Sequence, residues 1–188
     1  QGCDAEDAAC SLEELGNGDG SDYWVDVASH TVTGSDYTTG REHDEFSPVR
    51  GRFVRMLVDQ STCEISNHAR VFEIEVYGSF LPMCSCTTDL PENVALGRPV
   101  AVDSVLNDYV GANAVDGVMN VVENRWLSTP DQAEHFIVID LESDYSISSI
   151  DIYAGHCGGG VECTGFGDSS TEGNVAHGLC SHTLQVWQ

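Results

Sequence analysis

The sequence predicts an all-β fold, and two stretches carry most of that prediction. Residues 52–58 and 69–78 are dense in Val, Ile, Phe and Tyr, and apolar and polar residues alternate in both. Such alternation is typical of strands that bury one face. Gly78 is expected to end the second strand. Because 41% of the 188 residues are apolar and strand patterns recur, we expect a packed chain and no general disorder.

The segments before this pair predict smaller elements. Ser11 and Glu14 have the spacing of a helix capping box, which predicts a short helix near residues 11–15. Residues 23–27 are expected to form a short strand. The residues that follow, up to position 46, are rich in Thr, Ser and Gly and are expected to form polar turns.

The second half of the chain predicts three further strands, at residues 136–141, 147–153 and 184–187, where β-branched or aromatic residues recur. Before them, residues 81–92 hold two prolines and no periodicity, so we interpret them as a linker. Residues 154–179 are a Gly-rich insertion with two cysteines and too few large apolar residues to hold itself by burial.

The charge of the chain argues against two classes of partner. It carries 31 acidic residues against 7 basic ones, all of them Arg, so its net charge is -24. Such a chain repels nucleic acid and anionic membranes. Its apolar runs are only a few residues long, so no membrane insertion is expected. Acidic side chains suit divalent cations, but solubility alone also accounts for them.

The cysteines predict disulfide bonds. Their number is even and no pair has CxxC spacing, which in a Gly-rich β chain is typical of an oxidising compartment. We therefore expect an extracellular, secreted protein, and Gln1 in place of Met suggests a processed or excised chain. Cys3 with Cys10 and Cys157 with Cys163 are the simplest local pairings, and the connectivity is left open. The eight cysteines are Cys3, Cys10, Cys63, Cys84, Cys86, Cys157, Cys163 and Cys180.

Several segments together resemble one domain family. Residues 51–55 and 72–78 resemble its closing strand pair, and residues 93–100, 114–117 and 124–126 resemble its opening half. This is the discoidin family, also called the coagulation-factor type C domains, which includes the fucose-binding F-type lectins. The resemblance implies an antiparallel β-sandwich, or jelly roll, which the cysteines would make disulfide-rich.

The two halves of that domain stand in permuted order. Residues 1–80, the first half, resemble its C-terminal part; residues 93–188, the second half, resemble its N-terminal part; and residues 81–92 link them. Neither half can stand alone, because each would expose strand edges and an apolar face that includes, for example, Phe136 and Ile150. The first half is expected to complete the second half of the same chain, as a circular permutant, or of a neighbouring chain or repeat.

The resemblance also implies a Ca²⁺ site. In the family, a loop around a Val-Asp-Gly motif and the first Glu of the last strand bind the ion, and the matching residues here are Asp116 and Glu73. Ca²⁺ requires six to eight hard oxygen ligands. The expected set is the side chains of Asp116, Glu73 and Asn124 and the backbone carbonyls of Asn113, Val118 and Phe72. The alternative is that Asp116 only forms a tight turn and that Glu73 is a solvated strand carboxylate.

A zinc site is the second metal hypothesis. Three histidines and three cysteines gather in and after the insertion, but their spacing matches no finger or ribbon, and an oxidising compartment favours disulfides. They are His156, Cys157, Cys163, His177, Cys180 and His182.

Glycans are the alternative partners. The F-type lectins bind fucose through a His and two Arg; here His156 is present, both arginines are missing, and Cys180 stands where one would be expected. Another glycan could stack on an aromatic ring, although Trp126 and Trp187 are expected in the core. The candidate rings are those of Trp126, Trp24 and Tyr109.

The expected function is structural. No nucleophile elbow, HExxH motif or phosphate loop is present, so an enzyme is not expected. We expect an extracellular module that binds copies of itself head to tail and grows into a filament. The reason is the linker, whose residues Pro82, Pro91, Cys84 and Cys86 favour an extended segment held by disulfides. The alternative is a secreted, Ca²⁺-dependent carbohydrate-binding lectin that acts as one closed, circularly permuted domain.

Overall fold

The computed structural model describes residues 11–17, 23–31, 40–62, 67–80, 91–119, 124–154 and 179–188. These residues form mostly antiparallel β-sheet with few helical turns, which confirms the all-β prediction. No described helix is long and apolar enough to cross a membrane. The helical segments are α1 (Leu12–Gly16), η1 (Gln60–Thr62) and η2 (Gly111–Val115). The strands are β1 (Trp24–His30), β2 (Gly40–Asp59), β3 (Arg70–Phe80), β4 (Glu92–Asn93), β5 (Val100–Val102), β6 (Trp126–Leu127), β7 (Glu134–Ala154) and β8 (Ser181–Trp187).

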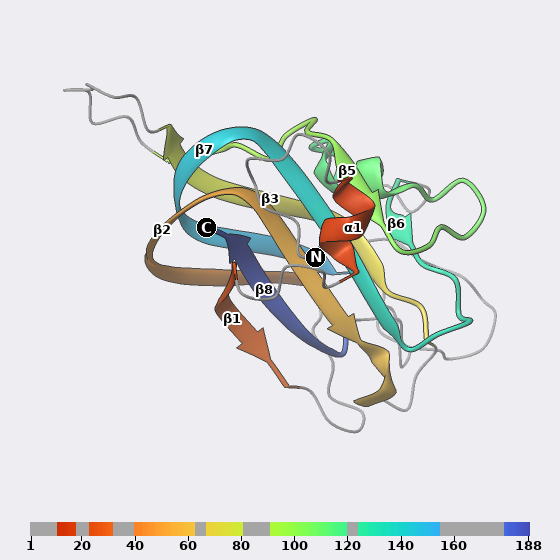
Figure 1. Ribbon diagram of the computed structural model, residues 1–188. Coiled ribbons are helices and arrows are strands. Elements are labelled where there is room, and N and C mark those ends of the chain that lie inside the picture. The colour runs from red at the N-terminus through yellow and green to blue at the C-terminus, as the bar shows by residue number, and fades with distance from the viewer. Residues whose placement is uncertain are drawn as a thin grey trace.

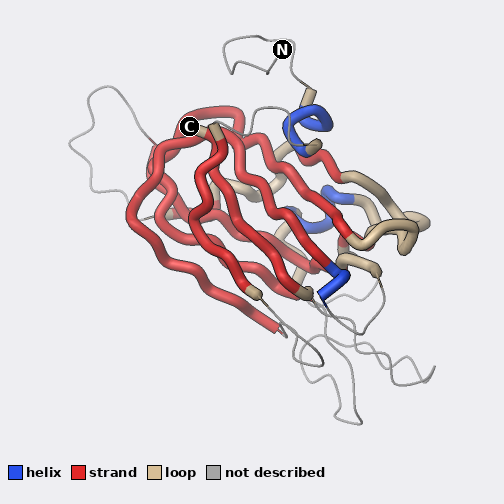
Figure 2. Tube along the Cα trace, turned by 60° about the horizontal axis from the view of Figure 1, so that its bottom comes forward, coloured by secondary structure: helices blue, strands red, loops and turns tan. Residues whose placement is uncertain are grey.

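Two long, bent strands organise the sheet. Neighbouring strands follow the order β1-β8-β2-β7-β3-β4, while β5 pairs with β7 and β6 pairs with β3. The first part of β2 pairs with the last part of β7, from Gly40 opposite Ala154 to Gly51 opposite Tyr145. The last part of β2 pairs with the first part of β7 on one side and with β8 on the other. Because both strands curve between these parts, the sheet folds into two facing layers around one interior (Figures 1 and 2).

The interior between the layers is apolar. Val54 of β2, Ile139 of β7 and Leu184 of β8 come from one layer, and Ile74 of β3 and Ile152 of β7 come from the other. All five are at most 2% exposed and belong to one continuous cluster. Burying such side chains stabilises the fold by roughly 1.5–3 kcal/mol each relative to leaving them exposed.

Helix α1 covers a second apolar cluster on the outer side of one layer. The helix begins with the predicted capping box: the Ser11 hydroxyl accepts the Glu14 amide at 3.3 Å, and the Glu14 carboxylate accepts the Ser11 amide at 2.8 Å. Arg55 of β2 lies at the other end of the helix and donates to the carbonyl of Leu15 at 2.7 Å. The cluster consists of Leu15, Trp24, Phe136, Val138 and Trp187.

Three of the differences from the predicted strand boundaries have a physical reason in the structure. β2 begins at Gly40, where the sequence predicts polar turns. The prediction missed this part of the strand because its inward positions include charged residues, which hide the apolar alternation. β7 is one strand where two are predicted; Glu142 adopts φ 64° at the bend, and pairing resumes on both sides of it. Gly78 lies inside β3, which continues to Phe80. A Cβ at Gly78 would lie 3.1 Å from the carbonyl oxygen of Ser146, so the glycine permits close approach of β7.

The two halves of the chain pair with each other extensively. β2 and β3 of the first half pair with β7 of the second, and β1 and β2 pair with β8. β3 and β4 are also antiparallel neighbours, with Tyr77 opposite Asn93, so the first half ends beside the start of the second. Each half therefore supplies strands without which the sheet of the other would be open.

Candidate functional site

Glu73 of β3 is a fully buried carboxylate at the joint between the two halves. Its Oε1 accepts the amide of Gly117 at 3.1 Å, and its Oε2 has no hydrogen-bond partner among the described residues. Burial raises the pKa of Glu73 to about 7; the Gly117 hydrogen bond opposes this rise, and the charges of Asp116 and Glu75 add to it. A buried carboxylate of this kind is costly unless a proton or a cation compensates it.

The loop at residues 116–118 presents a second carboxylate. Asp116 caps the C-terminal end of η2, and Gly117 follows with φ 82°, a backbone conformation that glycine adopts without steric cost. The Asp116 carboxylate accepts the amide of Val118 at 2.9 Å and the side-chain amide of Asn124 at 2.8 and 3.0 Å. Asp116, Gly117 and Val118 are exposed, so the loop opens to solvent beside the buried Glu73.

The side chains expected to bind Ca²⁺ are therefore brought to one place. Glu73 comes from the first half, and Asp116 and Asn124 come from the second. The donor set of two carboxylates and an amide fits a hard cation. Asn124 would have to turn its oxygen toward the ion, because its nitrogen now donates to Asp116. The ligand roles expected for the backbone carbonyls of Asn113, Val118 and Phe72 stay predictions.

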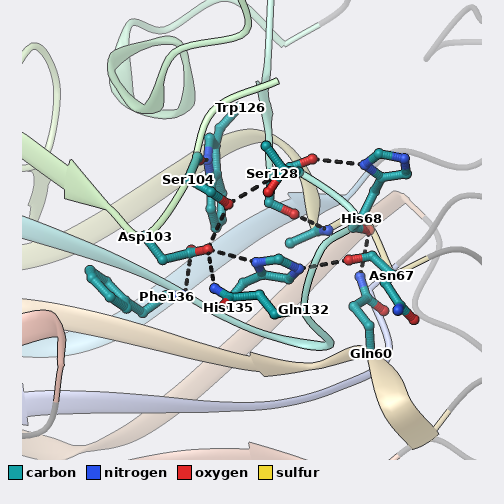
Figure 3. A network of polar contacts seen from close by, with 12 residues as sticks. Gln60, Asn67, His68, Asp103, Ser104, Trp126, Ser128, Gln132, His135 and Phe136 are labelled. Carbon is teal, nitrogen blue, oxygen red and sulfur yellow. Dashed lines mark hydrogen bonds and ion pairs between the residues drawn. The ribbon is translucent and has the colours of Figure 1, made fainter. Parts of the chain in front are cut away.

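A second polar cluster surrounds His135 at the start of β7 (Figure 3). The His135 side chain is fully buried; its Nδ1 lies 2.8 Å from Asp103 Oδ2, and its Nε2 lies 2.6 Å from the carbonyl oxygen of Asn67. Asp103 also accepts the backbone amide of Phe136 at 2.9 Å and the side-chain amide of Gln132 at 2.8 Å. Both ring nitrogens face acceptors, an arrangement that suits an imidazolium paired with a carboxylate.

These contacts raise the pKa of His135 and lower the pKa of Asp103. Burial works against the charge of His135, but the bonds to Asp103 and Asn67 outweigh burial and raise the pKa of His135. Burial likewise works against the charge of Asp103, but the bonds from His135, Ser104 and the amide of Phe136 outweigh it and lower the pKa of Asp103. The pair thus stabilises the folded state in its charged form, and the cluster is structural.

The His135–Asp103 pair should make stability depend on pH in two directions. The contribution of His135 is complete below its ordinary pKa of 6.5 and is lost as the pH rises through its raised pKa. The contribution of Asp103 is complete above its ordinary pKa of 3.8 and is lost as the pH falls through its lowered pKa. We expect His135→Gln to lower the free energy of unfolding by about 3 kcal/mol near pH 6. In urea titrations from pH 6 to 9, a variant profile parallel to that of the unmodified chain would contradict this.

The predicted zinc cluster is not assembled from the members that the structure describes. Cys180 is disulfide-bonded, so it is not a thiolate ligand. His182 lies instead beside β1 and β2: its Nε2 is 3.0 Å from a carboxylate oxygen of Glu42, and its ring stacks on that of His30 at 4.8 Å. The other cysteines and histidines predicted to form disulfides or to bind zinc lie outside the described residues: Cys3, Cys10, Cys63, Cys84, Cys86, His156, Cys157, Cys163 and His177.

The rings considered for sugar stacking are largely buried. Trp126 is fully buried and Trp187 is 2% exposed, so both are core residues as the sequence predicts. Trp24 is also buried, at 8%, and packs edge-on against Trp187 at 5.2 Å. Tyr109 is half-buried, and the guanidinium of Arg125 lies 4.3 Å from its ring centroid. Of the three candidate rings, Tyr109 alone keeps substantial access to solvent.

Sequence reasoning did not single out His30, Glu42 or Asp44, which lie close to His182. A signal was present in β2, where Glu42, Asp44 and Phe46 alternate with exposed residues. It was obscured because two of these three inward residues are acidic, which made the stretch look like a polar turn.

No protein-family model matches the chain, and no curated protein matches its sequence. The resemblance to the discoidin family therefore stays a prediction. Conclusions about function depend on the geometry of this chain alone.

Proposed function

We propose that the chain is an extracellular structural module that joins copies of itself head to tail, with a Ca²⁺ ion across the joint between its two halves. The position of Glu73 carries the proposal. Its buried carboxylate belongs to the first half and accepts the amide of Gly117 in the second half. An ion held by Glu73 and Asp116 would bind only where a first half and a second half meet.

Exchange of halves would turn this joint into a contact between copies. In one chain, the halves pair through β2 with β7 and β8, through β3 with β7, and through β1 with β8. If the first half of each copy completed the second half of the next, the same pairings would form between chains. Every copy would then be both donor and acceptor, and such a heterologous contact grows into a filament when its rotation does not close a ring.

The charge of the chain makes assembly depend on cations. Copies with a net charge of -24 repel one another in the absence of counterions. A divalent ion bound by two carboxylates at each joint neutralises charge where the halves meet, in addition to any coordination energy. Filament growth should therefore respond to Ca²⁺ more steeply than to the same ionic strength of a monovalent salt.

Sedimentation velocity on the native protein tests the proposal. In millimolar Ca²⁺ at high protein concentration, we expect species much larger than the 20.2 kDa chain, which disappear in excess chelator. Glu73→Gln should abolish the large species, and Asp131→Ala, at an exposed turn, should leave them unchanged. A compact monomer under all conditions would contradict the filament.

A monomeric result would favour the second candidate, a closed carbohydrate-binding domain. The strands of the first half pair with those of the second half within one chain, and this supports the alternative, because such a monomer needs no partner to close its sheet. Tyr109, half-buried beside Arg125, is the ring that could still stack on a sugar. A glycan array that gives hits lost in Tyr109→Ala would establish it, and an array without hits would leave the structural role.

A further inference from the structure

Four polar side chains meet at one end of the interior, where β1 ends and where β2 and β8 begin. His30 Nδ1 lies 2.7 Å from Glu42 Oε1, and His182 Nε2 lies 3.0 Å from Glu42 Oε2. The two imidazole rings are stacked, with centroids 4.8 Å apart and planes 18° from parallel. His30 and His182 are also direct cross-strand partners in the β1–β8 pairing. Asp44 completes the group, with its Oδ1 2.9 Å from His30 Nε2.

These side chains occupy positions that are otherwise apolar. His182 shares the inward face of β8 with Leu184 and Val186, which are both fully buried core residues. Its side chain has no exposed surface, and those of Glu42 and Asp44 are only 15% and 14% exposed. Polar groups in such positions cost stability unless specific partners satisfy them.

The hydrogen bond on the far side of the His182 ring determines which of its nitrogens carries a proton. His182 Nδ1 lies 3.0 Å from the carbonyl oxygen of Cys180, which can only accept, so Nδ1 donates. His30 has a carboxylate at each nitrogen, Glu42 at Nδ1 and Asp44 at Nε2; the tautomer that leaves Nδ1 open to an ion donates from Nε2 to Asp44. In neutral imidazoles, the nitrogens that remain, His30 Nδ1 and His182 Nε2, present lone pairs toward Glu42.

A lone pair that faces a carboxylate oxygen at this distance is repulsive unless a proton or a metal ion lies between the two. The contact of His182 Nε2 with Glu42 lacks hydrogen-bond geometry, and Nε2 has no other hydrogen-bond partner among the described residues. Asp44 Oδ2 is likewise buried without a hydrogen bond in that part of the chain. A metal ion would satisfy the groups that face one another at Glu42: it takes both lone pairs and one carboxylate, and it strengthens the bonds from the rings to Asp44 and to the Cys180 carbonyl.

We infer that His30, His182 and Glu42 bind a divalent transition-metal ion, best matched by Zn²⁺, with Asp44 and the Cys180 carbonyl orienting the two imidazoles. One ligand atom from each of the three residues lies within 4.8 Å of the others. Nitrogen ligands about 2.0–2.1 Å from a tetrahedral Zn²⁺ lie about 3.3 Å apart, so small side-chain movements suffice. Two imidazoles and one carboxylate favour Zn²⁺ over Ca²⁺, which prefers oxygen ligands alone.

The position of the site allows an ion to enter and to hold three strands together. The His30 side chain is 31% exposed, so an ion can reach the cluster from solvent. Three protein ligands leave a fourth position for water. The bound ion would fix β1, an edge strand paired with β8, to the start of β2 in the opposite layer.

Zinc titration of the intact, oxidised chain tests the inference. The protein is freed of metal with chelator, exchanged into excess Ca²⁺ to fill any oxygen site, and titrated with Zn²⁺ by calorimetry. We expect one tight Zn²⁺ that His30→Gln and Glu42→Gln each weaken by at least ~100-fold, more than the ~10–100-fold expected for Asp44→Asn, which removes an outer partner. His43→Gln is the matched control, because its exposed side chain lies on the opposite face of β2 from Glu42.

X-ray absorption of the zinc-loaded protein supplies a readout that does not depend on variants. Two imidazole nitrogens and oxygen, with no sulfur, are expected around the metal. Equal Zn²⁺ affinity in the unmodified chain, His30→Gln and Glu42→Gln would overturn the inference, as would sulfur ligation, which would move the ion to cysteines. If His30→Gln does not fold, Glu42→Gln carries the comparison, because it conserves side-chain volume.

Discussion

Adding Ca²⁺ to the metal-free protein at pH 8 should raise its melting temperature by about 5–10 °C, and Glu73→Gln should abolish that rise. A ligand at 100 times its dissociation constant stabilises the folded state by about 2.7 kcal/mol. In a chain of this length, each kcal/mol corresponds to about 2–4 °C. The buried Glu73 makes the effect specific. Its Oε2 has no hydrogen-bond partner among the described residues, and burial, which raises its pKa, destabilises the ionised carboxylate only while no cation is bound.

The same carboxylate sets the pH dependence of the response. Because the pKa of Glu73 in the folded state, about 7, exceeds the ordinary value of 4.5, the folded protein takes up its proton more readily than the unfolded protein does. The metal-free protein therefore loses this contribution as the pH rises through about 7. Ca²⁺ requires the ionised form, so the stabilisation by Ca²⁺ should be larger at pH 8 than at pH 5.

Three variants separate an ion site from an ordinary buried carboxylate. Metal-free Glu73→Gln should be more stable than the metal-free unmodified chain at pH 8, by about 1–3 kcal/mol, since the charge is gone. Asp116→Ala should weaken the response to Ca²⁺, while Asp131→Ala, at an exposed turn, should leave it intact. A melting temperature that is the same in Ca²⁺ and in chelator would remove the metal from the proposed function.

Alternation in the sequence predicted strands wherever one face is apolar and the other polar. β3 and β8 have this pattern; β3 was found close to its predicted bounds, whereas β8 begins at Ser181, three residues before the predicted start. The first part of β2 does not have it, because Glu42 and Asp44 face inward there, and β2 also passes through Pro48 at an irregularity in its pairing with β7. The sequence predicted Phe136 and Ile150 on one apolar face. Because β7 bends between them, Ile150 lies in the interior between the layers and Phe136 lies in the cluster beneath α1.

Sites between strands depend on pairing register, which local sequence does not encode. Glu73 and Asp116 were connected through the family resemblance, since nothing in their own neighbourhoods links them. His30 and His182 became neighbours only through the register of β1 with β8, and Glu42 reached them from the opposite layer. The spacing of histidines and cysteines pointed instead to the insertion, because spacing detects only clusters that are local in sequence.

Replacing Arg55 with Ala should cost about 2–4 kcal/mol of unfolding free energy and should expose the apolar cluster beneath α1. Arg55 is 4% exposed, and burial lowers its pKa to about 10, with Asp26 opposing that shift, so it remains charged at neutral pH. Its guanidinium donates to the carbonyl of Leu15 at 2.7 Å and to Gln185 Oε1 at 2.8 Å, and it lies 4.2 Å from a ring centroid of Trp24.

The loss would act through these acceptors as well as through the missing side chain. The Leu15 carbonyl lies at the C-terminal end of α1, where carbonyls have no partner within the helix. Loss of the Arg55 side chain therefore leaves this buried carbonyl without its hydrogen-bond donor. Once α1 detaches, Phe136, Val138 and Trp187 lose their cover. We expect Arg55→Ala to bind a hydrophobic dye and to aggregate non-specifically without regard to Ca²⁺, unlike the ordered assembly proposed above.

Arg50→Ala is the matched control for Arg55→Ala. Arg50 lies on the same strand and pairs with Asp144, but its side chain is 72% exposed, so its loss should change stability by no more than about 0.5 kcal/mol. Arg55→Lys should fall between the two, because lysine keeps the charge but cannot reach both acceptors with one planar group. Urea denaturation of the three variants would measure these differences. Equal stability of Arg55→Ala and Arg50→Ala would show that Arg55 does not hold α1 in place and that apolar contacts alone attach the helix to the sheet.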